Sequence, residues 1–87
     1  MENFYMTARL VSLGDRLEVE VIESDSGMVG VFWVITSEET LYTDAVGNKI
    51  GREALKAGDL LCIRFGGQIM MSYPPQIVAR GIGILDS

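Results

Sequence analysis

Apolar and polar side chains alternate along two neighbouring stretches, residues 7–13 and 16–23. The second stretch carries three aliphatic residues of one parity: Leu17, Val19 and Val21. A period of two is typical of a strand with one buried and one solvated face. Gly14-Asp15, between the two stretches, suits a type II′ turn, so the pattern predicts a β-hairpin.

Residues 28–35 are apolar at every position except Gly30, which predicts a strand that is either covered on both faces or tightly curled, with a bend at the glycine. Residues 36–39 fit a capping box, which can begin a helical turn. Residues 40–43 behind them are rich in β-forming residues, so we predict a loop followed by a short strand.

Good helix formers occupy residues 51–57 and stop at Gly58, which predicts a helix of about two turns with a left-handed end. Residues 60–65 and 77–85 predict the last two strands, joined by a loop. In the last strand four small or aliphatic residues share one parity: Ile77, Ala79, Gly81 and Gly83. Two glycines on one side of a strand predict close approach of another backbone or strong coiling.

Apart from the short strand at residues 40–43, the order of these elements is three strands, a short helix and two further strands, which is the order of an OB-fold. We therefore predict an all-β fold, a small OB-fold-like barrel of five to six strands with one short helix before the penultimate strand. A chain of 87 residues has room for one modest core, so residues 1–87 are predicted to form a single OB-like barrel domain. Strand count alone does not separate this fold from an SH3-like barrel.

Two segments of the second half carry a family resemblance. They are the run from Leu55-Lys56-Ala57-Gly58-Asp59 to Phe65, and Ser72-Tyr73-Pro74-Pro75-Gln76-Ile77 with Ala79. This part of the chain resembles the C-terminal half of the YobA-like family of uncharacterised small bacterial proteins. The resemblance is specific over residues 55–79 and weak before residue 28. It departs from the family at Pro75, where a small residue such as alanine is expected, and in having no leader with a lipid-modified cysteine.

The resemblance implies an OB-like barrel and a family whose members are often secreted or lipid-anchored. Because that family has no settled activity, it transfers no catalytic residue to this chain. From the sequence as given, with no leader and no disulfide, we expect a cytoplasmic protein. A trimmed leader would instead make it secreted or lipid-anchored.

Charge is unevenly distributed along an acidic chain of net charge −5. Residues 1–47 carry nine acidic and two basic side chains, whereas residues 48–87 carry three acidic and five basic ones. Phosphate backbones are bound mainly by clustered lysine and arginine, and no basic run occurs here. General nucleic-acid binding is therefore disfavoured. No apolar run approaches the roughly 20 residues that a membrane-spanning helix needs.

Four residues are the candidate binding residues: Tyr42, Ser72, Tyr73 and Gln76. Two prolines after Tyr73 stiffen the loop that flanks the usual ligand face of an OB-fold. The favoured alternative is that the Tyr73 ring plugs one end of the barrel. Phe32 and Trp33 point to opposite faces of a strand, and for both we favour a place in the core.

The remaining chemistry-bearing residues have plainer interpretations. Cys62, the only cysteine, lies in an apolar run and is interpreted as a buried structural thiol. Met70 and Met71 are interpreted as gap-filling side chains rather than a soft partner-binding surface. Four acidic residues match no metal-binding loop and are interpreted as a solvated strand face: Glu18, Glu20, Glu23 and Asp25.

We predict a non-catalytic binding or interaction module, because the chain has no histidine and no tuned acid, base or nucleophile. No cofactor and no metal are expected. An unknown protein or a small polar ligand is the favoured partner. The alternative is a single-stranded nucleic-acid-binding OB-fold, with aromatic and basic contacts from Trp33, Tyr42, Tyr73, Lys49, Arg64 and Arg80. A third possibility is a structural domain that pairs with itself, and the sequence leaves the oligomeric state open.

Overall fold

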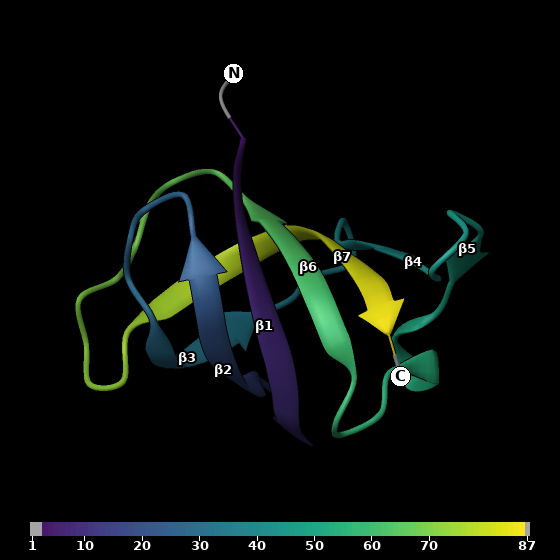
Figure 1. Cartoon of the computed structure of the whole chain (residues 1–87), viewed down its shortest axis with the longest axis horizontal. Helices are drawn as coiled ribbons and strands as arrows, with labels where there is room; N and C mark the ends of the chain where they lie inside the picture. Colours follow the sequence, from purple (N-terminus) through teal and green to yellow (C-terminus); the bar gives the residue numbers. More distant parts are fainter. Residues whose placement is uncertain (1–2, 87) are drawn as a thin grey trace.

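The computed structural model describes residues 3–86 and contains one seven-stranded sheet (Figure 1). One 3-10 turn, η1 (Arg52–Ala54), is the helical element of this part of the chain. The strands are β1 (Phe4–Leu13), β2 (Leu17–Ser24), β3 (Gly30–Ile35), β4 (Leu41–Thr43), β5 (Lys49–Ile50), β6 (Leu60–Phe65) and β7 (Gln76–Asp86).

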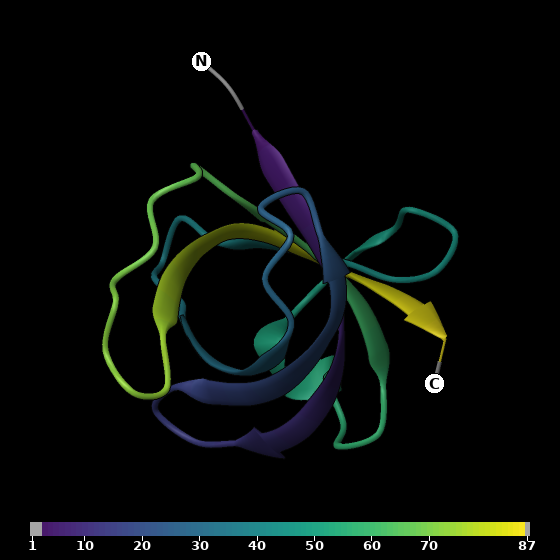
Figure 2. The ribbon, with the colours of Figure 1, turned by 60° about the vertical axis from the view of Figure 1, so that its left-hand side comes forward.

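Five of these strands close into a barrel. The sheet order runs β3-β2-β1-β6-β7, and a parallel pairing of β3 with β7 shuts the ring. This connectivity confirms the predicted all-β, OB-like barrel. The β4–β5 hairpin lies outside the ring, where β4 pairs with the second half of β7. Figure 2 shows the ring, with the β4–β5 hairpin on one side and the β6–β7 loop on the opposite side.

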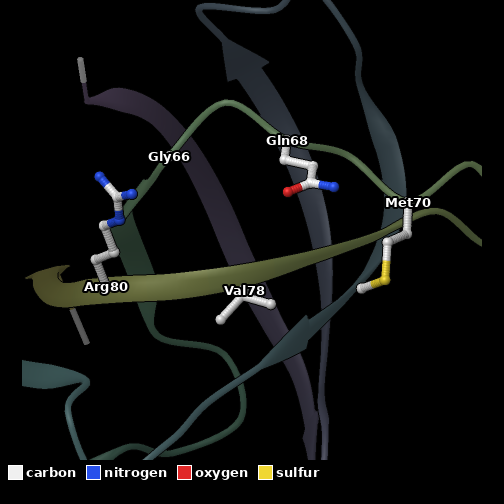
Figure 3. Close-up of a pocket in the computed structure, with 5 residues that line it drawn as sticks. All are labelled: Gly66, Gln68, Met70, Val78 and Arg80. Atoms are coloured by element: carbon white, nitrogen blue, oxygen red, sulfur yellow. The ribbon is translucent and has the colours of Figure 1, made fainter. Parts of the chain in front are cut away.

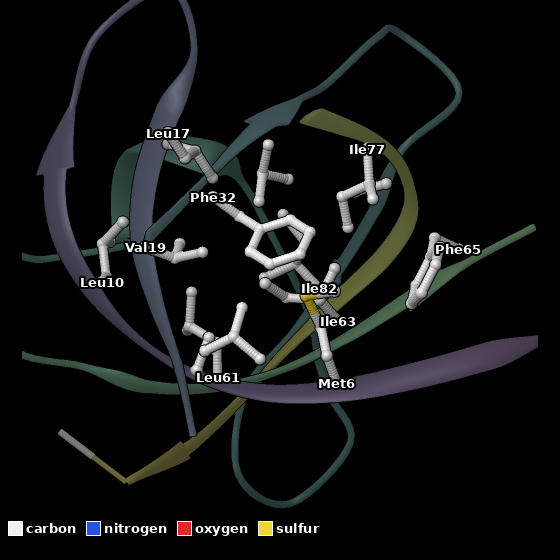
Figure 4. Packing of buried hydrophobic residues seen from close by; sticks show 14 of the residues in the cluster. Met6, Leu10, Leu17, Val19, Phe32, Leu61, Ile63, Phe65, Ile77 and Ile82 are labelled. Carbon is white, nitrogen blue, oxygen red and sulfur yellow. The ribbon is translucent and has the colours of Figure 1, made fainter. Parts of the chain in front are cut away.

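The core fills the barrel with side chains of alternating strand positions, as the period of two predicts. Aliphatic residues dominate it, with one phenylalanine near the centre (Figure 4). Representative fully buried members are Leu10, Leu17, Val19, Phe32, Ile63 and Ile82. Each such side chain contributes about 1.5–3 kcal/mol of burial free energy, so a few of them determine whether a chain this short folds.

The predicted hairpin forms, but its turn is different. Leu13 pairs with Leu17, which leaves a three-residue connection from Gly14 to Arg16. A type II′ turn needs a positive φ at its first central residue, and Gly14 is not among the glycines with positive φ. The II′ assignment was therefore wrong. Longer hairpin connections of this kind are common, and here the loop places Arg16 next to β3.

The predicted two-turn helix at residues 51–57 is wrong. Helical geometry ends after Ala54, because Leu55 is extended and buried. The next residues form a tight turn that hydrogen-bonds to β1: Gly58 N–H donates to the Leu10 carbonyl at 2.8 Å, and Leu10 N–H donates to the Asp59 carbonyl at 2.9 Å. These bonds to a neighbouring strand replace the bonds that a longer helix would make, so tertiary pairing overrides helix propensity.

The shared parity predicted for Ile77, Ala79, Gly81 and Gly83 does not hold along β7. A bulge lies in β7 where Phe65 pairs with Ala79 and Arg64 pairs with Gly81. One extra residue shifts the parity, so the core-facing position beyond the bulge is Ile82. Gly81 then lies under Arg64, and a Cβ there would come within 2.9 Å of Nη2 of that arginine. The close approach at Gly81 is therefore made by the Arg64 side chain and not by another backbone, as was predicted.

Smaller differences concern strand ends. The first strand begins at Phe4, earlier than predicted, and the third begins at Gly30. Strand β5 was not predicted, because two residues are too short to show a period. The loop before it is closed by Asp44, whose carboxylate accepts hydrogen bonds from the Val46 and Asn48 N–H groups.

Candidate binding surface

The β6–β7 loop, residues 66–75, is held in shape by its own hydrogen bonds. Met70 and Gln76 exchange two backbone bonds of 2.8 and 3.0 Å. Within the loop tip, the Gln76 side-chain amide donates to Ser72 Oγ, which donates to the Pro74 carbonyl at 2.7 Å. Ser72 and Gln76 therefore support the tip, and Gln76 belongs both to the tip and to the start of β7.

Tyr73 lies at the end of this tip and is fully exposed, at 102% of its reference surface. The interpretation of Tyr73 as a barrel plug is therefore wrong. The bonds that close the tip hold the ring away from the barrel, while Phe65 and Ile77 fill the nearby interior. A large ring left wholly in water is a candidate contact for a partner.

A groove of about 460 Å³ separates the loop tip from the beginning of β3. Its walls are apolar: Val29, Val31, Tyr73, Pro74 and Pro75. Val29, just before β3, is 62% exposed and Val31, within β3, is 46% exposed, so together with Tyr73 they form an exposed apolar patch. We call this feature the seam groove, because it continues the line along which β3 and β7 close the barrel.

The rim of the seam groove on the β2 side is polar and acidic. Glu20 stands opposite Val31, and Glu18 stands opposite Trp33, in the β2–β3 pairing. The Arg16 guanidinium lies 4.4 Å from the Trp33 ring centroid, within cation–π range. Arg16 also donates to the Gln76 side-chain oxygen at 3.4 Å. One cation is thus already held by this face.

The two neighbouring aromatic residues of β3 point to opposite faces of the strand. Phe32 is fully buried, as predicted, whereas Trp33 is half-buried on the outer face under Arg16. The core interpretation of Trp33 was therefore wrong. Its parity points it outward, and the arginine covers the indole that water would otherwise contact.

Three of the four predicted binding residues come together, and the fourth does not. Ser72, Tyr73 and Gln76 share the loop tip beside β3. Tyr42 is buried at 8% exposure and lies opposite Ile82, six residues along β7 from Gln76. At about 3.3 Å per residue this is a separation of roughly 20 Å. Its ring packs into the core, so it is not available to the surface around Tyr73.

A second concavity of about 290 Å³ lies between the same loop and β7 (Figure 3). Its lining residues are Gly66, Gln68, Met70, Val78 and Arg80. Met70 and the neighbouring Met71 are exposed at 39% and 75%, so the gap-filling interpretation of this pair was wrong. The two methionines extend the apolar character of the loop beyond the seam groove.

Cys62 lies on the outer face of β6 and is half-buried, so the prediction of a buried thiol was wrong. Burial, and to a lesser extent the negative charge of Asp25, raise the pKa of the Cys62 thiol. The thiol is therefore protonated at neutral pH and is a weak nucleophile. Sequence reasoning placed the residue in the right strand but on the wrong face.

The acidic residues of β2 and the following turn do not gather into a metal site. Within residues 3–86 no group of three or more histidine, cysteine, aspartate or glutamate side chains is placed to hold a metal ion. Asp25 instead accepts a hydrogen bond of 2.9 Å from the Tyr5 N–H, which ties the β2–β3 turn to β1. Over the same described residues, no helix has the length and apolarity to cross a membrane.

Comparison with known proteins finds similarity in the fold and not in the sequence. No family model and no curated protein sequence matches the chain. A tryptophan-to-alanine variant of CusF from Escherichia coli with Cu(II) is similar in structure, with a TM-score of 0.65, 11% identity and coverage of 97% of this chain and 98% of that one. CusF with Ag(I) gives a TM-score of 0.59, 11% identity and coverage of 97% and 99%. These similarities support the OB-like barrel.

Proposed function

We propose that this OB-like barrel is a non-catalytic binding module that holds a segment of a partner protein in the seam groove. The observation that carries the proposal is the fully exposed Tyr73 ring beside two exposed valines, Val29 and Val31. The position of the seam groove also matches the usual ligand site of an OB-fold, where the surface of the second and third strands and the loop before the last strand contact the ligand.

The shape and chemistry of the groove favour a protein over a small polar ligand. Its walls are valine, tyrosine and proline, and its polar groups stand at the rim. A small polar ligand needs convergent hydrogen-bonding groups inside a pocket. An apolar centre with a polar rim and one prominent aromatic ring is instead typical of a protein interface.

The metals of the CusF structures are not supported by the residues of this chain. Cu(II) takes nitrogen and oxygen ligands, and soft ions take thiolate or thioether sulfur. The sequence has no histidine, and the raised pKa of Cys62 disfavours its thiolate. Met70 lines its concavity beside Gln68 and Arg80, with no second sulfur among the lining residues. The donor set does not fit, and we assign no metal to this module.

Single-stranded nucleic acid is the second candidate, and the placement of its predicted contacts argues against it. Tyr42 is buried, and two carboxylates flank the groove where phosphates would pass. Arg64 lies across Gly81 on the other wall, and Lys49 belongs to the β4–β5 hairpin. Stacking rings and basic side chains are thus separated, whereas single-strand binding needs them along one path.

Peptide selection tests the proposal. Short peptides displayed on phage are selected against the protein, and the binders are mapped by amide chemical shifts. We expect shifts centred on Val29, Val31 and Tyr73, and we expect Tyr73→Ser to weaken binding about tenfold, as loss of a central aromatic contact does. Val46→Ser is the matched control, because Val46 is 82% exposed on the opposite hairpin.

Two results would contradict the proposal. Peptide binding that Tyr73→Ser and Val46→Ser change equally would place the interaction elsewhere. Micromolar binding of a labelled oligothymidylate with a steep salt dependence would favour the nucleic-acid alternative. The likeness of residues 55–79 to the YobA-like family stays a prediction, and it is compatible with either ligand.

A further inference from the structure

A chain of polar side-chain contacts crosses the seam at the point where the backbone pairing of β3 with β7 ends. The terminal register position is Trp33 opposite Gln76, where the Trp33 N–H donates to the Pro75 carbonyl at 2.9 Å. The next bond of a parallel ladder would need an N–H from residue 75, which is proline and has none. The ladder therefore cannot continue toward the seam groove, and the contacts that follow are made by side chains.

Arg16 lies over this terminal pair. Its guanidinium is 4.4 Å from the centroid of the Trp33 ring, and its Nη1 donates to Gln76 Oε1 at 3.4 Å. A bond of this length contributes little by itself. The ring under the guanidinium limits the positions that the side chain can take, so the donor is held toward Gln76. Arg16 thereby links the β1–β2 connection to both strands of the seam.

From Gln76 the contacts continue into the tip of the β6–β7 loop. Gln76 Nε2 donates to Ser72 Oγ at 3.1 Å, and Ser72 Oγ donates to the Pro74 carbonyl at 2.7 Å. Ser72 and Pro74 are the residues on either side of Tyr73, whose exposed ring forms one wall of the seam groove. The contacts that begin at Arg16 therefore end on both sides of this ring.

Donor and acceptor chemistry fixes the direction of every bond in this chain of contacts. A guanidinium can only donate, so the Gln76 oxygen faces Arg16 and the Gln76 NH2 group faces Ser72. A carbonyl can only accept, so the Ser72 hydroxyl hydrogen points to Pro74. A flipped Gln76 amide would present donors to the guanidinium and would draw the Ser72 hydroxyl away from Pro74. The orientation of one amide thus connects Arg16 with the loop tip.

We propose that Arg16, although it lies outside the walls of the seam groove, is a positioning residue for this site. It orients the Gln76 amide, and the amide in turn orients the Ser72 hydroxyl that holds the tip around Tyr73. Without Arg16 the amide can flip, and the tip then takes up more than one conformation. Because only molecules with a formed wall bind, the apparent affinity falls by the fraction of such molecules. This inference rests on the proposed function and names a residue that controls its site.

Amide hydrogen exchange of the 15N-labelled protein tests this positioning without a ligand. The Met70 and Gln76 amides close the tip through bonds of 2.8 and 3.0 Å, so their exchange reports its opening. Arg16→Ala is expected to speed this exchange about threefold, the effect of losing one weak hydrogen bond. Arg16→Lys should speed it less, because lysine is also a donor and also stacks on rings. Arg9→Ala is the matched control, since Arg9 donates to the Gly58 carbonyl.

Ser72→Ala separates positioning from a general loss of stability. This variant lacks the last link, so its tip is already loosened, and adding Arg16→Ala should change the exchange of the tip amides very little. The fluorescence of Trp33 should be unchanged in Ser72→Ala, because the arginine stack remains. Equal acceleration by Arg16→Ala in the presence and absence of Ser72 would overturn the proposal. Unchanged exchange in Arg16→Ala would also overturn it.

A fluorescein-labelled peptide from the phage selection connects positioning to binding. We expect Arg16→Ala to weaken its binding about threefold, in proportion to the change in exchange, and Arg16→Lys to restore most of the affinity. Faster exchange with unaltered peptide affinity would overturn the role of Arg16 in the site and leave the binding module intact. Absence of any groove-binding peptide would overturn the proposed function, and the exchange measurements would still decide whether Arg16 orients the tip.

Discussion

At the scale of single residues, Asp59 joins a turn to the barrel. Its side chain is buried at 3% exposure, and Oδ2 accepts a hydrogen bond of 2.9 Å from the Lys56 N–H. Its own carbonyl accepts from Leu10 N–H in β1. One residue therefore accepts hydrogen bonds from two segments, which explains the Leu55-to-Asp59 motif as a structural turn.

Asp59→Ala is expected to lower the free energy of unfolding by about 1–3 kcal/mol, because the Lys56 N–H loses its acceptor in a partly buried place. Asp59→Asn keeps an acceptor oxygen and is the control, with a smaller expected loss. Urea unfolding at neutral pH measures both. Equal losses for the two variants would show that the charge, and not the hydrogen bond, is what the turn requires.

Asp44 is a second residue whose environment predicts a measurable effect. Hydrogen bonds from the Asn48 backbone above all, and also from the Val46 and Gly47 N–H groups and the Asn48 side chain, hold the pKa of Asp44 below its ordinary value. A pKa lower in the folded than in the unfolded state stabilises the fold above the unfolded value. That contribution disappears as the pH falls through the folded value.

Carboxyl-carbon NMR should therefore find Asp44 titrating below the ordinary aspartate value of about 3.9. In Asp44→Asn the stability should decline less steeply on acidification below about pH 4. Asp15→Asn is a control, since Asp15 is exposed in the β1–β2 connection. A normal titration of Asp44 would show that the turn is open in solution.

At the scale of elements, the β1–β2 connection is tied to β3 by the Arg16–Trp33 contact. We expect Arg16→Ala to shift Trp33 fluorescence to longer wavelength, because the indole loses its cover. The stability cost should be about 0.5–1 kcal/mol, the range of an exposed cation–π pair. Arg9→Ala is the control, since Arg9 donates to the Gly58 carbonyl and does not stack on the tryptophan. An unchanged spectrum would show that the stack does not form.

The elements also show what sequence patterns can and cannot predict. Alternation placed the strands of the barrel because burial repeats every two residues, and Ser72, Tyr73 and Gln76 were grouped because they are close in the chain. The prediction that the Tyr73 ring lies inside the barrel was wrong because the orientation of the ring depends on the backbone bonds between Met70 and Gln76, which the sequence pattern does not show. The parity of the last strand was lost at a bulge, and helix propensity was overridden by pairing with β1. The bulge and the bonds to β1 depend on segments that are distant in the chain, which local patterns do not contain.

At the scale of the whole molecule, the seam is the weakest closure of the ring. β1 pairs with β6 continuously from Phe4 to Arg9, whereas β3 pairs with β7 only from Trp33 to Ile35. Amide exchange should therefore be faster for the seam amides of Trp33 and Ile77 than for buried amides of β1 and β6. Hydrogen-exchange NMR measures this order, and uniform exchange would indicate that the barrel opens only by global unfolding.

The seam also has a consequence for how the protein is made. Its two strands are separated by more than forty residues of chain, and β7 follows every other barrel strand in the order of synthesis. Before residues 76–78 are synthesised, the nascent chain can form only an open sheet, and the apolar side chains of its inner face are exposed to solvent. Formation of the ring is therefore a late step of biogenesis, and a nascent chain stalled before Gln76 is expected to need protection from aggregation.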